Sequence, residues 1–139
     1  IGMGQHFAAA AVGKTGYVTR ADCARAAAAA LMQETGSSVL DITGPAALSQ
    51  GDIAVILSEI SGKDIPYIPI STDDLVQAMI GAGLPEFMAK VFASFDEAMA
   101  KDYLNVATGD LEKLTGQAGQ SARDFLIANK AALLTPPAH

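Results

Sequence analysis

Apolar residues recur at helical spacing through the second half of this chain, whereas the first half alternates helix-like segments with short apolar runs. The runs at residues 17–19, 38–43 and 65–70 predict short strands, and residues 7–12 form either a strand or an apolar loop. Six segments predict helices, at residues 20–34, 50–61, 72–81, 85–99, 110–116 and 122–133. The pattern therefore predicts a small mixed α/β domain with about three short strands, five to six helices and a helical C-terminal half.

The predicted helix starts share a polar signature. A Ser or Thr stands three residues before an Asp, which is the spacing of a capping box, at residues 19–22, 49–52, 71–74 and 121–124. An Asp in the first turn is also favoured by the positive end of the helix dipole. We therefore interpret these four carboxylates as capping groups without an acid–base role.

Two segments carry packing information. Residues 26–30 are all Ala, so neighbouring backbones can approach that helix closely, and we expect other elements beside it. The predicted strand at residues 65–70 contains Pro66 and Pro69, which cannot donate ladder hydrogen bonds and place it at a sheet edge. The Phe and Met residues between Phe87 and Met99 are expected to be mainly core, with a smaller chance that some line a pocket for a planar ligand.

Composition narrows the functional class. The 139 residues match one domain, and a 50% hydrophobic content is enough for a core. A net charge of -6 argues against nucleic acid and anionic membranes as partners. The single cysteine excludes an internal disulfide and suits a reducing compartment, no signal peptide is visible, and the apolar run at residues 26–32 is too short to span a bilayer. We therefore expect a cytoplasmic protein.

The residue pattern by itself names no catalytic or metal-binding group. The chain has no G-x-G-x-x-G motif between a strand and a helix, and Gly13–Lys14–Thr15 is interpreted as a plain turn. With His6, His139 and one cysteine, no metal-ligand set can be assembled. A Cys23–His6 nucleophile pair is conceivable, but a small buried apolar residue is the favoured interpretation of Cys23. Arg20 stands at a strand–helix junction, where α/β folds often form clefts.

Several short motifs follow one another along the chain in a specific order. They are GKTGYVTRADCA at residues 13–24, VLDITGP at 39–45, SQGDIA at 49–54, LSEISGK at 57–63, YIPIS at 67–71, GLPE at 83–86, LEKLTG at 111–116 and SARDFL at 121–126. Their order resembles the NmrA-like atypical short-chain dehydrogenases and reductases, and among them the NAD(P)H:quinone oxidoreductases. One departure is that the family often has Gly-Asp-Gly-Lys where this chain has Val12–Gly13–Lys14.

The resemblance implies that residues 1–139 are a single domain, the C-terminal, substrate-side part of a Rossmann-type protein whose N-terminal cofactor-binding part is absent. The parent would bind NADP or NAD, whereas this chain alone is expected to bind neither, and no cofactor-binding residue can be assigned on it. By position in the resemblance, Phe7, Tyr17 and Arg20 are candidate substrate-binding residues beside the nicotinamide, and Phe87 and Met88 are candidates for the outer wall.

The implied activity of the parent is hydride transfer from NAD(P)H to a quinone or a related carbonyl acceptor, and the chain alone is expected to be inactive. Two alternatives stay open: a non-enzymatic NmrA-like regulator that senses dinucleotides, and a stand-alone domain that binds an apolar ligand or a partner protein. A cofactor-binding part would cover the Ala-rich helix at residues 24–31. We therefore expect the chain alone to form a homo-oligomer through that exposed surface.

Overall fold

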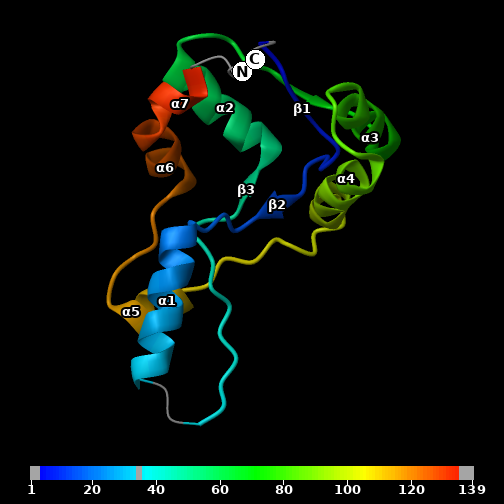
Figure 1. Ribbon diagram of the computed structural model, residues 1–139. Coiled ribbons are helices and arrows are strands. Elements are labelled where there is room, and N and C mark those ends of the chain that lie inside the picture. Colours follow the sequence, from blue (N-terminus) through cyan, green and yellow to red (C-terminus); the bar gives the residue numbers. More distant parts are fainter. Residues whose placement is uncertain (1–3, 34–35, 135–139) are drawn as a thin grey trace.

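The computed structural model describes residues 4–33 and 36–134 as an arrangement of short strands and helices (Figure 1). The predicted mixed α/β fold class with a helical C-terminal half is confirmed. The strands are β1 (His6–Ala8), β2 (Lys14–Thr15), β3 (Leu48–Ser49) and β4 (Tyr67–Pro69). The helices are α1 (Arg20–Gln33), α2 (Gln50–Ser61), α3 (Thr72–Gly81), α4 (Glu86–Ala100), α5 (Asp110–Thr115), α6 (Ala122–Ala128) and α7 (Lys130–Leu134). Glu34, the predicted end of the first helix, and His139 lie outside the described residues.

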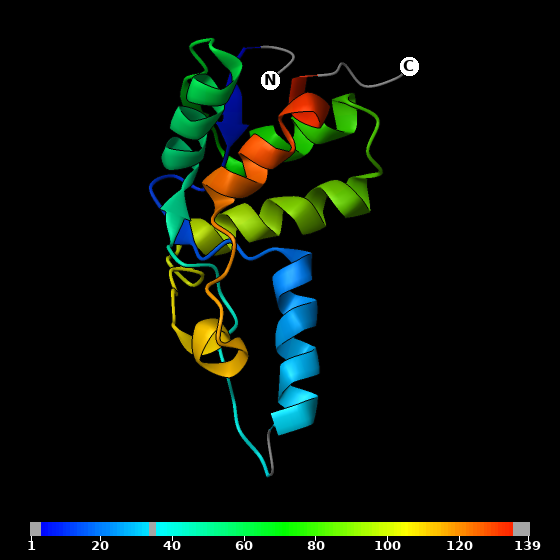
Figure 2. The same ribbon diagram turned by 90° about the vertical axis from the view of Figure 1, so that its left-hand side faces the viewer.

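The strands form two small sheets of two strands each among the described residues. Strand β1 pairs in parallel with β4, and β2 pairs antiparallel with β3. The prediction that the proline-containing segment lies at a sheet edge is confirmed, because β4 has β1 as its one neighbour in its sheet. Two views agree that α1 and α5 lie at one end of the molecule, with the other helices at the opposite end (Figures 1 and 2).

Two predicted strands are wrong. In the part of the chain that the structure describes, residues 17–19 lead directly into α1 without entering a ladder, and residues 38–43 are not assigned to a strand. The second segment is held instead by side chains near the start of α5: the Thr43 hydroxyl accepts from the Thr108 backbone N–H at 2.9 Å, and the Asp110 carboxylate accepts from the Asp41 N–H at 3.2 Å. Side-chain oxygens, and not a neighbouring strand, accept from the backbone N–H groups of Asp41 and Thr108. The apolar pattern of residues 38–43 therefore could not indicate what the segment contacts.

The predicted serine caps are confirmed. The hydroxyls of Ser49, Ser71 and Ser121 accept from the backbone N–H three residues further on, and Ser49 with Asp52 forms a complete capping box. Helix α2 ends at Gly62, whose φ of 70° is in the left-handed region that glycine adopts readily. The helix predicted at residues 122–133 is interrupted at Asn129, the C-cap of α6, and continues as α7.

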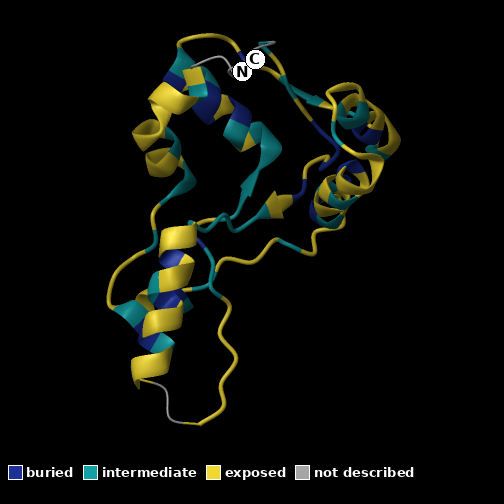
Figure 3. Ribbon diagram, viewed as in Figure 1, coloured by how far each residue is buried: buried dark blue, intermediate teal, exposed yellow. Residues whose placement is uncertain are grey.

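Alanine faces make the closest helix contacts. Ala89 and Ala93 of α4 are buried with Leu75 and Val76 of α3, whereas Ala26 and Ala29 of α1 are buried with residues of α5. Figure 3 shows that the remaining positions of α1 and α4 are mostly exposed, with some of intermediate burial.

The prediction that the Phe and Met residues from Phe87 to Met99 are mainly core is wrong for the aromatic rings, although Met99 is buried. Phe87 is 74% exposed and Phe95 is 56% exposed, because α4 turns its alanines toward α3 and its rings outward. Cys23 is also exposed, although a buried position was predicted for it. It occupies the first turn of α1.

Candidate functional site

A pocket of ≈ 800 Å³ lies where α1 and α2 begin and α6 runs past them. Its volume suits a ring-sized organic molecule. Its wall is largely apolar, and Arg20 is the one charged residue that lines it. The lining residues are Tyr17, Val18, Thr19, Arg20, Ala21, Gln50, Ile53, Gln120, Ala122, Phe125 and Leu126.

One wall of the pocket carries a chain of hydrogen bonds from β1 to the Tyr17 hydroxyl. The Nε2 atom of Gln50, the first residue of α2, donates to Tyr17 Oη at 3.1 Å. The Oε1 atom of the same amide lies 2.7 Å from His6 Nε2. Gln50 Nε2 also lies 3.7 Å from the Sδ atom of Met99 at the end of α4. Three elements therefore converge on one amide, which holds the tyrosine in place.

The environment of Tyr17 keeps its phenol protonated. Partial burial raises the pKa of Tyr17, the negative charge of Asp96 raises it further, and the hydrogen bond from Gln50 opposes both effects. Asp96 is held near this wall because its Oδ2 atom accepts from the Ala9 backbone N–H at 2.8 Å. At neutral pH Tyr17 is thus a hydrogen-bond donor with an intact O–H group.

The backbone around Tyr17 is held by two glycines. A Cβ atom on Gly44 would lie 1.8 Å from the Tyr17 carbonyl oxygen, and one on Gly16 would lie 2.2 Å from the Val106 carbonyl oxygen. Gly44 also donates its N–H to the Gly16 carbonyl at 3.4 Å. Only residues without a side chain allow these backbones to approach so closely, so the glycines determine where Tyr17 enters the pocket.

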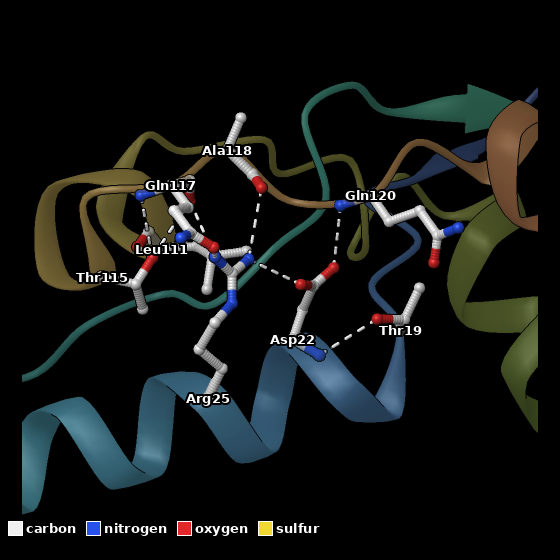
Figure 4. A network of polar contacts seen from close by, with 8 residues as sticks. All are labelled: Thr19, Asp22, Arg25, Leu111, Thr115, Gln117, Ala118 and Gln120. Atoms are coloured by element: carbon white, nitrogen blue, oxygen red, sulfur yellow. Dashed lines mark hydrogen bonds and ion pairs between the residues drawn. The ribbon is translucent and has the colours of Figure 1, made fainter.

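The opposite wall is held by a charged network at the start of α1 (Figure 4). The Asp22 carboxylate accepts from Arg25 at 2.7 Å and from the Gln120 backbone N–H at 2.9 Å. Arg25 also donates to the Ala118 carbonyl at 3.2 Å and to Gln117 Oε1 at 2.9 Å. The network therefore fixes the loop before α6 and, with it, Gln120 in the pocket wall.

The interpretation of Asp22 as a simple capping residue is wrong. The Thr19 hydroxyl does accept from the Asp22 N–H at 3.0 Å. The Asp22 carboxylate, however, accepts from the Gln120 backbone N–H and from Arg25, and not from the backbone at the helix start. Asp22 is 6% exposed. Burial raises its pKa, but the hydrogen bonds from Gln120, Arg25 and Thr19 and the charge of Arg25 outweigh burial, so the pKa is lowered overall.

Arg20 supplies an uncommitted positive charge. It is exposed at the first residue of α1, and its guanidinium has no hydrogen bond or ion pair with any described residue. The dipoles of α1 and α2 add partial positive charge where both helices begin. The pocket can thus hold a planar apolar ligand, while the Arg20 cation and the neutral Tyr17 hydroxyl are available to electronegative atoms at the edge of that ligand.

The structure brings together two of the five predicted substrate-binding residues. Tyr17 and Arg20 line the pocket, whereas Phe7, Phe87 and Met88 are not among its lining residues. Any part that these five residues take in substrate binding stays a prediction.

Gln50 and Gln120 were missed by sequence reasoning, because uncharged amides form no recognisable motif. The available signal was their position, since each stands directly beside a capping serine. Where two capped helix starts lie close together in the fold, the residues beside their capping serines, here Gln50 and Gln120, can line the same pocket.

Other kinds of site are not evident in the described part of the chain. Its His, Cys, Asp and Glu residues form no group of three or more that could hold a metal ion. None of the helices in residues 4–33 and 36–134 combines the length and the apolar character needed to cross a membrane.

The chain is similar to part of two curated reductases. The chain is 31% identical over 121 residues to NAD(P)H azoreductase of Xenophilus azovorans, covering 86% of this chain and 42% of the relative. It is 35% identical over 115 residues to Quinone oxidoreductase 2 of Escherichia coli, covering 81% of this chain and 40% of the relative. The chain thus spans about two fifths of the length of the relatives it matches.

Solved structures agree with these relatives. The NADPH complex of NADPH-dependent quinone oxidoreductase from Escherichia coli superposes with a TM-score of 0.83 at 30% identity, covering 96% of this chain and 46% of that one. The NADP(H) complex of triphenylmethane reductase from Citrobacter sp. gives a TM-score of 0.84 at 28% identity, covering 93% and 45% respectively. No protein-family profile matches the chain.

Over most of its own length the chain is similar to NAD(P)-binding reductases of the NmrA-like kind. Its homologues are NAD(P)H-dependent quinone and azo reductases, as the resemblance predicted.

Proposed function

We propose that this chain is the substrate-binding part of an NAD(P)H-dependent oxidoreductase that reduces quinones or related carbonyl acceptors by hydride transfer. The observation that carries the proposal is the pocket of ≈ 800 Å³, which combines apolar walls with Arg20 and Tyr17. A quinone is a flat apolar ring with two electronegative oxygens, so it needs these two kinds of surface. Relatives named as quinone and azo reductases support the same substrate class.

The proposed cofactor is NADP, because the solved relatives are complexes with NADPH or NADP(H). The residues present do not fit its phosphates, since the sequence has no glycine-rich loop between a strand and a helix. We therefore place the cofactor-binding residues in a part of the protein outside these residues. When bound there, the nicotinamide supplies the hydride. The residues of this chain bind and orient the acceptor and exclude water from it.

The test is steady-state kinetics of the full-length polypeptide that contains these residues, with NADPH or NADH and a series of quinones. We expect quinone-dependent oxidation of the reduced nicotinamide. We also expect Tyr17→Phe to raise KM for the quinone more than KM for the dinucleotide, and Arg20→Ala to do so for a quinone that carries a sulfonate. Tight dinucleotide binding without turnover of any quinone would contradict the proposal and favour a regulator that senses the dinucleotide.

A further inference from the structure

The Gln50 side chain has one orientation that satisfies all its neighbours. The Met99 sulfur, 3.7 Å from Gln50 Nε2, can accept a hydrogen bond but cannot donate one. The amide nitrogen therefore faces Met99 and Tyr17, and its two N–H groups are directed to Met99 Sδ and Tyr17 Oη. The amide oxygen is left to accept from His6, whose Nε2 atom lies 2.7 Å away and carries the proton in this arrangement.

This orientation determines what the Tyr17 hydroxyl can do. Its oxygen accepts from Gln50, so its own proton is not used in that contact. Within the described residues the Tyr17 hydroxyl makes no other hydrogen bond, and Tyr17 lines the pocket. Burial and the Asp96 charge raise the pKa of Tyr17, so the proton stays on the phenol at neutral pH.

We infer that Tyr17 donates a hydrogen bond from its hydroxyl to a carbonyl oxygen of the acceptor molecule, and that Gln50 and His6 are positioning residues that leave this proton free. The inference rests on the proposed function, because it names the atom that recognises the quinone in the same pocket. Hydride transfer to a quinone increases the negative charge on its oxygens, so a donor held at that place stabilises the reduced product as it forms.

A pair of ligands that differ only in the two oxygens tests the inference without turnover. We choose 2,3-dimethyl-1,4-naphthoquinone and 2,3-dimethylnaphthalene, whose rings fill a pocket alike. The methyl groups block addition of the exposed Cys23 thiol to the quinone ring. Dissociation constants for both ligands are measured by NMR titration of the chain. The chain suffices for this measurement because it contains every residue that lines the pocket. The quantity compared is the preference, defined as the hydrocarbon constant divided by the quinone constant.

Three variants separate donation from packing. Tyr17→Phe removes the hydroxyl and keeps the ring. Gln50→Glu keeps the side-chain length but puts a carboxylate beside Tyr17, which draws the phenol proton away from the pocket. Gln50→Met is the matched control, because it has similar length and contains no oxygen to compete for that proton.

We expect the unsubstituted chain to prefer the quinone by about 3- to 10-fold, the effect of one neutral hydrogen bond. Tyr17→Phe and Gln50→Glu should bring the preference close to unity while hydrocarbon binding is unchanged. Gln50→Met should give an intermediate preference, because it removes the donor that holds Tyr17 but does not take the Tyr17 proton. An unchanged preference in Tyr17→Phe, or equal loss of both ligands there, would overturn the inference.

Two further outcomes distinguish this inference from the function on which it rests. Equal binding of both ligands by the unsubstituted chain overturns the role of Tyr17 but leaves the pocket as a site for the apolar ring. Binding of neither ligand overturns the proposed pocket and the inference together. An unchanged preference in Gln50→Glu, or a loss in Gln50→Met as complete as that in Gln50→Glu, would overturn the inference that Gln50 leaves the Tyr17 proton free.

Discussion

Two polar networks hold residues of the pocket wall, and they differ in how their hydrogen bonds end. The network of Asp22 and Arg25 closes on itself: the carboxylate and the guanidinium both end on the loop before α6 (Figure 4). The chain from His6 through Gln50 ends at the Tyr17 hydroxyl, which makes no other hydrogen bond among the described residues. A closed network holds structure, whereas an open one is available to a ligand. Changes in the first should therefore alter stability, and changes in the second should alter binding.

The largest effect is expected from Asp22→Ala, which opens the closed network. Removing a 6% exposed carboxylate leaves the Gln120 N–H without its acceptor and takes from Arg25 its one ion-pair partner among the described residues. We expect the free energy of unfolding to fall by about 3 kcal/mol. Urea denaturation followed by circular dichroism measures it.

The control is Asp124→Ala, which removes an exposed capping carboxylate at the same position after its serine. It should cost about 1 kcal/mol or less. Equal losses in the two variants would show that Asp22 acts as an ordinary cap.

Gly44→Ala should have the next largest effect and should alter both properties. Its Cβ would stand 1.8 Å from the Tyr17 carbonyl oxygen, which is backbone and cannot rotate away. We expect a loss of about 2 kcal/mol from the forced backbone shift, together with weaker quinone binding because Tyr17 moves.

The matched control for this prediction is Gly81→Ala at the end of α3, where a Cβ would meet nothing within 4 Å. Alanine has the higher helix propensity, so this variant should be neutral or slightly more stable. If the Gly44→Ala chain were destabilised but bound the quinone as the wild type does, the prediction that Gly44 determines the position of Tyr17 in the pocket would be contradicted.

Local signals predicted the fold where a contact spans only a few residues. The serine caps at 49, 71 and 121 were recognised because donor and acceptor stand three residues apart. The strand expected at residues 38–43 failed because its neighbours, Thr108 and Asp110, are more than sixty residues away along the chain. A short apolar run does not reveal whether its backbone N–H and C=O groups will bond to another backbone or to side chains.

The pocket was predictable only in part, for the same reason. Tyr17 and Arg20 stand out as residues at a junction before a helix, and both line it. Asp22 has the local spacing of a cap, and nothing near it in sequence indicates that its carboxylate is used by Gln120, 98 positions away. Gln50 acquires its role from His6 and Met99, which come from two other elements.

Acid should weaken the closed network selectively. The pKa of Asp22 is lowered in the folded chain, so its contribution to stability is complete above its ordinary pKa and is lost as the pH falls through the lower, folded value. Asp22→Asn lacks this titration. The stability difference between the wild type and this variant should therefore be constant near neutral pH and shrink in acid below the ordinary carboxyl range. Urea titrations at several pH values measure it, and a difference that grows in acid would contradict the assignment.

The smallest effect is expected from Arg20→Ala, and it should fall on binding alone. Because the guanidinium has no partner among the described residues, unfolding free energy should change by less than about 0.5 kcal/mol. Affinity for a naphthoquinone that carries a sulfonate should fall about 2- to 5-fold, the range for an exposed ion pair, while affinity for the neutral quinone stays constant.

Arg123→Ala is the matched control for Arg20, since Arg123 is also an exposed arginine but is paired with Glu59 and does not line the pocket. It should leave both affinities unchanged. Equal losses in the two variants would show that net charge, rather than a cation at the rim, attracts the sulfonate. A loss confined to Arg20→Ala locates the charge at the start of α1, beside the wall that the Asp22 network holds. The Asp22 network would then hold the helix start that carries Arg20 without pairing with Arg20 itself. In the same way, the chain from His6 through Gln50 holds Tyr17 without using its hydroxyl proton.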